Sequence, residues 1–85
     1  MAEVIMYCTH FCPYCSRAEM LLRKKGVEIE KILVDRDRGL MQEMVEKSAG
    51  RTSVPQIFID GYHVGGFDDM VELDMEGKLD PLLQA

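Results

Sequence analysis

The order of apolar and polar positions along the chain predicts an alternation of strands and helices. Residues 3–8, "EVIMYC", form a short and nearly continuous apolar run that is typical of a buried strand. Apolar side chains then recur at helical spacing, at Tyr14, Ala18, Leu21 and Leu22. Pro13 suits the first turn of this helix, and Gly26 supplies its end.

A second strand and a second helix follow. Residues 27–34, "VEIEKILV", first alternate and then become fully apolar, which fits a strand. The stretch "DRDRGLMQEMVEKSAG", which ends at Gly50, predicts a helix. Its apolar face consists of Leu40, Met41, Met44 and Val45. We interpret the methionines on this face as an adaptable part of the core.

The last third of the chain predicts a hairpin and a helix. Asp60 and Gly61 stand between two apolar runs in "VPQIFIDGYHVGG", which is a strong signal for a two-residue turn. Pro55 lies at the start of the first run, where a strand tolerates proline. The following "FDDMVELDMEG" predicts a helix opened by Asp68 or Asp69, and "DPLLQ" predicts a short turn or helix.

This order of elements predicts an α/β fold. The strand–helix–strand unit makes two parallel strands with a right-handed crossover, and the hairpin adds two antiparallel strands. We therefore expect a four-stranded mixed sheet, in the order β-α-β-α-β-β-α, flanked by helices. The chain has 85 residues, and we expect residues 1–85 to form a single domain.

Composition and charge narrow the classes of partner. The chain is 47% apolar and 29% charged, and its net charge is −5. Residues 60–85 contain seven acids and one lysine, whereas a nucleic-acid site needs a basic surface. No apolar run approaches the roughly 20 residues that cross a bilayer, and the start of the chain lacks a signal pattern. We expect a cytoplasmic protein that binds neither nucleic acid nor membranes.

The candidate chemistry lies in "FCPYC", residues 11–15. In a cytosolic chain with three cysteines, a Cys-x-x-Cys pair is more often redox-active or metal-binding than structural. A cross-link between Cys12 and Cys15 would close so short a loop that it would add little stability. We interpret Cys8 as a small apolar residue at the end of the first strand, and His10 and His63 as surface residues.

The place of the pair at a helix start favours redox chemistry. Cys12 would lie beside free backbone N–H groups and the positive end of the helix, and both favour a thiolate. Cys15 lies one turn into the helix, so it should be less acidic and less exposed. The pair thus predicts a nucleophile at Cys12 and a resolving thiol at Cys15.

Metal binding is the alternative. A zinc site needs four ligands, and the nearby candidates Cys8 and His10 share one short segment with the pair, so we expect no bound metal. An iron–sulfur cluster shared between two chains is harder to set aside, because thiols of a partner could complete it.

Three motifs together resemble the dithiol glutaredoxins, most closely the bacterial glutaredoxin-3 type. They are "CPYC" after the first strand, "TSVPQIFIDG" opening the hairpin and "GGFDDM" opening the next helix, and "LDPLL" follows them. The resemblance covers essentially the whole chain. It implies a thioredoxin-like fold and a glutathione-dependent oxidoreductase that reduces protein–glutathione mixed disulfides and protein disulfides.

The resemblance also implies the site. Cys12 would be the nucleophile and Cys15 the resolving cysteine. Glutathione, as co-substrate, would lie against Tyr14, Gln42, Arg51, Val54, Pro55, Gly66, Phe67, Asp68 and Asp69. The backbone of Val54 would pair with the cysteinyl part of glutathione, as an added strand does. Asp68 and the helix start would hold the γ-glutamyl group, and Gln42 would meet the glycyl carboxylate.

Within this resemblance Pro55 would be a cis-proline, and two positions depart from the family pattern. Many relatives carry a lysine three residues before the first motif cysteine, where this chain has Thr9. Phe67 stands where a small residue or cysteine is commoner. Both departures are expected to affect how glutathione binds.

The partners implied are glutathione and glutathionylated or disulfide-containing proteins, and we expect a monomer. Two alternatives stay open. One is a hydrogen donor that thioredoxin reductase, rather than glutathione, reduces again after each cycle. The "GGFDD" signature argues against it, because this signature implies a glutathione site. The other alternative is a dimeric carrier of an iron–sulfur cluster.

Overall fold

The computed structural model describes residues 2–84. Its elements are β1 (Val4–Cys8), α1 (Pro13–Lys24), β2 (Glu30–Leu33), the 3₁₀ helix η1 (Val34–Arg36), α2 (Arg38–Lys47), β3 (Gln56–Ile59), β4 (Tyr62–Gly65), α3 (Phe67–Met75) and α4 (Leu79–Leu83). Within the described residues, none of these helices has the length and apolar character needed to cross a membrane.

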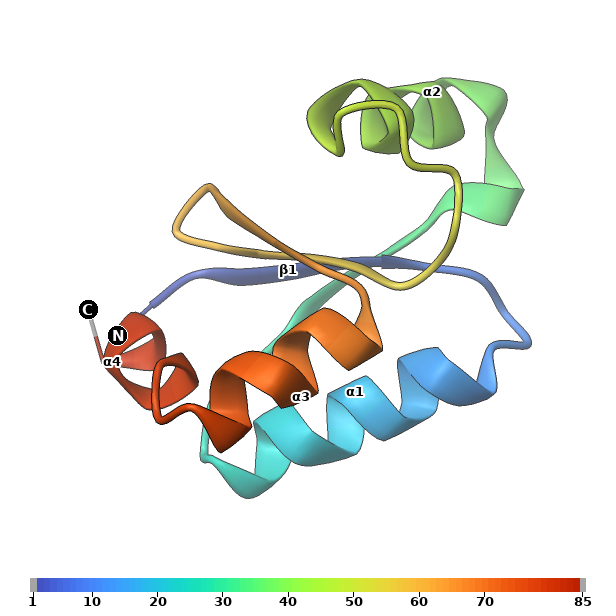
Figure 1. Ribbon diagram of the computed structural model, residues 1–85. Coiled ribbons are helices and arrows are strands. Elements are labelled where there is room, and N and C mark those ends of the chain that lie inside the picture. Colours follow the sequence, from blue (N-terminus) through green and yellow to red (C-terminus); the bar gives the residue numbers. More distant parts are fainter. Residues whose placement is uncertain (1, 85) are drawn as a thin grey trace.

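The four strands form one mixed sheet in the order β2-β1-β3-β4, which confirms the predicted α/β fold. Strand β1 pairs in parallel with β2 and antiparallel with β3, and β3 pairs antiparallel with β4. Helices α1, α3 and α4 cover one face of the sheet and α2 covers the other (Figure 1). The motifs predicted at the ends of β1 and β4 therefore meet on the α1 and α3 side.

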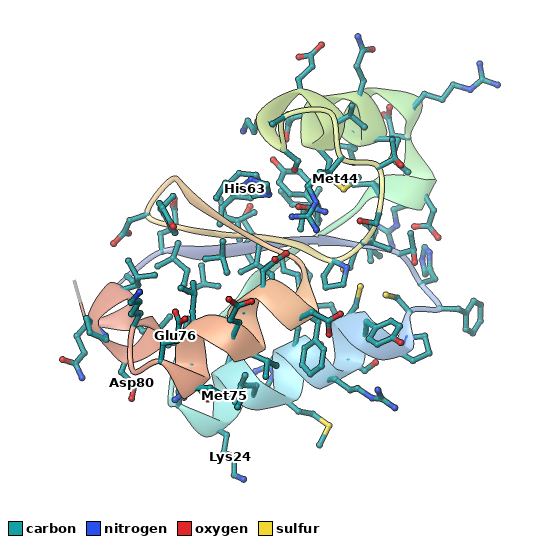
Figure 2. The ribbon with its side chains drawn as sticks, viewed as in Figure 1. Lys24, Met44, His63, Met75, Glu76 and Asp80 are labelled. Atoms are coloured by element: carbon teal, nitrogen blue, oxygen red, sulfur yellow. The ribbon has the colours of Figure 1, made fainter. Side chains whose placement is uncertain are left out.

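Alternate side chains of the central strands build two separate cores, because successive residues of a strand point to opposite faces. Met6 packs with Leu22 and Met70 on the α1 and α3 side, and all three are fully buried. Tyr7 packs with Met44 on the α2 side. Figure 2 shows Met44 between α2 and the sheet, which confirms the predicted apolar face of that helix.

Several predicted boundaries are wrong. The strand predicted over 27–34 is shorter, because β2 begins only at Glu30 and Val34 already begins η1. The helix predicted over 35–50 is also shorter, because η1 takes up its start and α2 spans Arg38–Lys47. Helix α3 begins at Phe67, with Gly66 as the preceding extended residue, and neither Asp68 nor Asp69 opens it. Asp69 instead reaches back to accept the backbone N–H of Gly66 at 2.9 Å, which is the capping role of a third helical residue.

The hairpin forms as predicted. Asp60 and Gly61 both have positive φ, 49° and 82°, as a two-residue turn of this kind requires. Ile57 pairs with Gly65 and Phe58 with His63, so one extra residue, Val64, makes a bulge in β4. The exit of the hairpin thereby leads directly into α3.

Candidate active site

The sulfur of Cys12 caps the first helix. Cys12 has an extended backbone and precedes Pro13, and its Sγ accepts the backbone N–H of Cys15 at 3.2 Å. The first helical turn, residues 13–16, contains no acidic side chain that would oppose a negative sulfur. A thiolate at this place is held by a backbone donor and by the positive end of the helix.

Cys15 and Cys8 are kept as thiols. Cys15 is only 5% exposed, and burial together with a hydrogen bond to Cys12 raises its pKa. Burial also raises the pKa of Cys8, although the charge of Lys31 opposes this. Cys15 is therefore the less exposed member of the pair, as predicted, and its raised pKa fits the role of a resolving thiol. Cys8 ends β1 as a buried residue, as predicted.

A hollow of about 150 Å³ lies beside Cys12. Its lining comprises Tyr14, Arg51, Ser53, Val54, Pro55, Gly66, Phe67, Asp68 and Asp69. The Sγ of Cys12 lies 3.9 Å from the carbonyl oxygen of Val54, so the sulfur stands at the edge of this hollow. The Val54–Pro55 peptide bond is cis, as the resemblance implied.

Aromatic rings form one wall of the hollow. The rings of Tyr14 and Phe67 lie 6.2 Å apart and are tilted by 39°. The guanidinium of Arg17 lies over the Tyr14 ring at 5.5 Å. Phe67 thus narrows the hollow from the α3 side, where a smaller residue would leave it open.

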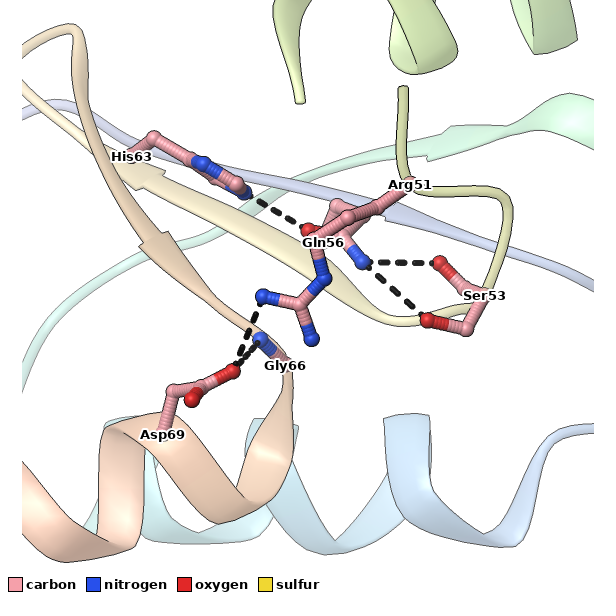
Figure 3. A network of polar contacts seen from close by, with 6 residues as sticks. All are labelled: Arg51, Ser53, Gln56, His63, Gly66 and Asp69. Atoms are coloured by element: carbon pink, nitrogen blue, oxygen red, sulfur yellow. Dashed lines mark hydrogen bonds and ion pairs between the residues drawn. The ribbon is translucent and has the colours of Figure 1, made fainter. Parts of the chain in front are cut away.

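Charged groups also line the hollow. The Asp69 carboxylate accepts from Arg51 Nη1 at 3.1 Å as well as from the backbone N–H of Gly66 (Figure 3). The Gly66 N–H, and then Arg51, hold the pKa of Asp69 below its usual range. The Asp69 carboxylate is therefore already hydrogen-bonded within the protein. Asp68, at the same helix start, is exposed.

Gln42 does not line the hollow. It is exposed on α2, where its Nε2 donates to Glu46 Oε1 at 3.2 Å. The structure therefore brings together all the predicted glutathione residues except Gln42, whose contact with glutathione stays a prediction.

His10 contacts a partner that the sequence did not reveal. Its Nδ1 lies 2.8 Å from Asp35 Oδ2, and its backbone N–H donates to the same oxygen at 3.2 Å. These hydrogen bonds hold the pKa of Asp35 below its usual range. The loop before Cys12 is thereby attached to η1, and the imidazole is committed to this carboxylate.

Three residues near the site were missed or misread. Ser53 lines the hollow, and the buried Gln56 donates to its carbonyl oxygen at 3.0 Å. His63, expected on the surface, is half-buried and lies 2.7 Å from Gln56 Oε1. The only available signal was the polar Gln56 within an apolar strand.

Within residues 2–84, no three His, Cys, Asp or Glu side chains are grouped to hold a metal ion.

Comparison with known proteins agrees with this geometry. The glutaredoxin family model matches residues 4–64. Glutaredoxin 3 of Escherichia coli is 50% identical over 84 residues, covering 99% of this chain and 100% of that protein. A glutaredoxin of Pseudomonas aeruginosa is 49% identical over 85 residues and is covered completely.

Solved structures give the same result. A buckwheat glutaredoxin–glutathione complex superposes with a TM-score of 0.89 at 29% identity, covering 98% of this chain and 77% of that one. A glutaredoxin from Brucella melitensis has a TM-score of 0.85 at 49% identity, covering 98% and 89% of the two chains. The chain therefore belongs to the glutaredoxin family of thiol–disulfide oxidoreductases.

Proposed function

We propose that this chain uses glutathione to reduce protein–glutathione mixed disulfides and protein disulfides, with Cys12 as nucleophile and Cys15 as resolving thiol. The observation that carries the proposal is the Cys12 sulfur, which caps α1 at the edge of the hollow. The similar buckwheat protein is described in complex with glutathione. Residues 1–85 would act as a single domain, as a monomer in the cytoplasm.

The mixed-disulfide reaction needs Cys12 alone. The Cys12 thiolate attacks the glutathione sulfur, a Cys12–glutathione bond forms, and the protein cysteine leaves as a thiolate that takes up a proton. The thiolate of a second glutathione then attacks the glutathione sulfur of this adduct. Glutathione disulfide forms, and Cys12 leaves as a thiolate ready for the next cycle.

Protein disulfides need both cysteines. Cys12 attacks one sulfur of the substrate and releases the other as a thiolate. Cys15 then loses its proton and attacks Cys12, which forms the Cys12–Cys15 disulfide and releases the reduced substrate. Two glutathione molecules reduce this disulfide in turn. The raised pKa of Cys15 supports this order, because a protonated Cys15 does not compete while Cys12 makes its first attack.

The hollow suits an extended, charged peptide. We assign the Val54 backbone to the cysteinyl part of glutathione, since its carbonyl oxygen lies beside the Cys12 sulfur. The exposed Asp68 would hold the γ-glutamyl amine, and the α3 start would hold the adjoining carboxylate. Tyr14, Phe67, Gly66 and Pro55 would shape the walls. Arg51, and Gln42 from α2, would approach the remaining carboxylate.

Cysteine substitutions test the assignment of roles. In turnover coupled to glutathione reductase, Cys12→Ser should abolish reduction of a glutathionylated peptide, because it removes the only attacking sulfur. Cys15→Ser should keep much of that activity and lose reduction of a protein disulfide, because no thiol resolves the adduct. Cys8→Ala is the matched control and should keep both activities.

Two outcomes would contradict the proposal. Full activity of Cys12→Ser would remove Cys12 from the mechanism. Turnover with thioredoxin reductase that exceeds turnover with glutathione and glutathione reductase would instead show that glutathione is not the physiological reductant.

A further inference from the structure

A fully buried amide lies just behind the hollow. Gln56, the first residue of β3, is 0% exposed. Its Nε2 donates to the carbonyl oxygen of Ser53 at 3.0 Å and to Ser53 Oγ at 3.3 Å. Its Oε1 lies 2.7 Å from His63 Nε2 (Figure 3). Burying a polar group is costly unless it is hydrogen-bonded, and both ends of this amide are.

These contacts fix both the amide and the imidazole. The Ser53 carbonyl oxygen can only accept, so the amino end of Gln56 must face it. The amide oxygen must therefore face His63, and His63 Nε2 must carry the proton that it donates. His63 Nε2 can donate to the Gln56 oxygen whether or not Nδ1 is also protonated.

The imidazole is itself anchored in the core. Its ring stacks on Phe58, with centroids 4.8 Å apart and an angle of 24°. Phe58 in turn meets the buried Tyr7 edge-on at 5.7 Å. The packed rings of Tyr7 and Phe58, on the α2 face of the sheet, therefore hold the His63 imidazole in contact with Gln56.

The amide fixes a segment that lines the hollow. Ser53 lines the hollow and adjoins Val54, whose carbonyl oxygen lies 3.9 Å from the Cys12 sulfur. Arg51, at the other end of the segment, is held by Asp69. Residues 51–54 are thus attached at two points, by Arg51 to α3 and by Ser53 to the Gln56–His63 pair.

We propose that Gln56 and His63 are positioning residues, which hold the Ser53–Val54 backbone where it pairs with the sulfur-bearing peptide of the substrate. The proposal rests on the function proposed above. Neither side chain belongs to the lining of the hollow, and neither touches the reacting sulfurs. Their loss should therefore weaken substrate binding and leave the chemistry at Cys12 unchanged.

Steady-state kinetics with a glutathionylated peptide test this assignment. Gln56→Leu and His63→Leu should each raise KM about three- to tenfold, the equivalent of one lost hydrogen bond, and should change kcat less than about twofold. His63→Gln should restore much of the KM, because its amide can donate from nearly the same place as Nε2. Tyr62→Leu is the matched control on the same hairpin and should change neither parameter.

NMR order parameters of the Ser53 and Val54 backbone N–H groups give a readout that needs no glutathione. These order parameters should fall in both leucine variants and stay normal in His63→Gln and Tyr62→Leu, with urea unfolding used to choose conditions where every variant is folded. An unchanged KM and unchanged order parameters in folded His63→Leu would overturn the proposal. If glutathione fails to support turnover in the wild type, the proposed function falls, and the order parameters alone still decide the positioning role.

Discussion

Asp69 shows how one side chain serves both the fold and the site. Its carboxylate accepts from the Gly66 N–H at 2.9 Å and from Arg51 at 3.1 Å, and its side chain is 45% exposed. These contacts, the Gly66 N–H first, lower its pKa in the folded protein below the value of about 3.9 in an unfolded chain. Its contribution to stability is therefore complete above that pH and is lost as the pH falls through the folded pKa.

Asp69→Asn tests this dependence on charge. The amide oxygen can still cap Gly66, but the charge is gone, so we expect a loss of about 0.5–1 kcal/mol at pH 7. The difference from wild type should shrink as the pH falls below about 4, because the wild-type carboxylate is then neutralised. Urea unfolding at several pH values measures it, with Asp68→Asn as the neighbouring control. A difference that is the same at pH 7 and pH 3 would contradict the explanation.

At the scale of elements, the hairpin and its exit place the site. The bulge at Val64 precedes Gly65, which has a φ of 110°. A Cβ at Gly65 would collide with the Asp69 carboxylate and would lie 2.9 Å from Arg51 Nη1. Gly61 in the turn also has positive φ, but the space around it is open. A side chain at Gly61 would therefore meet backbone strain alone, whereas a side chain at Gly65 would meet both backbone strain and a collision.

Alanine at each glycine tests this difference. Gly61→Ala should cost about 1 kcal/mol, because an L-residue is strained at positive φ. Gly65→Ala should cost about 3 kcal/mol, because the collision with Asp69 adds to that strain. Urea unfolding measures both. Equal losses in the two variants would show that the crowding around Gly65 has no energetic consequence.

At the scale of the whole molecule, the sheet is covered unequally. Among the described residues, three helices pack on one face, and α2 covers the other together with the short η1 (Figure 1). Met44 is the fully buried residue of α2, whereas Met75 of α3 is 84% exposed and points away from the core (Figure 2). The attachment of α2 should therefore depend strongly on one side chain.

Met44→Ala should destabilise the protein by about 2–4 kcal/mol, because it removes buried methylenes and leaves a cavity. In a domain of this size that corresponds to a fall in Tm of about 10–20 °C. Thermal unfolding followed by circular dichroism measures it, and Met75→Ala should unfold close to wild type. A small shift for Met44→Ala would mean that α2 is held mainly by other contacts, such as the hydrogen bond of 2.6 Å from Tyr7 to Glu43.

Much of the fold was predictable because it depends on neighbours within a few residues. Apolar periodicity indicates α1 and the apolar face of α2, and Asp60-Gly61 indicates the hairpin turn. The order of elements predicts a mixed sheet because few topologies connect a strand–helix–strand unit to a hairpin. Short motifs also placed Cys12 at a helix start.

The tertiary structure alone decided which distant side chains meet. His10 and Asp35 are 25 residues apart, and Arg51 and Asp69 are 18 apart. Local periodicity carries no signal for either pair, because each contact depends on how whole elements pack. The same holds for Gln56, a polar residue whose burial is tolerated only because Ser53 and His63 reach it from two other segments. The sequence by itself determined that the Cys12–Cys15 pair stands at the start of a helix, and it predicted the elements around the pair, whereas packing across the sheet determined the walls of the hollow and the polar contacts that hold them.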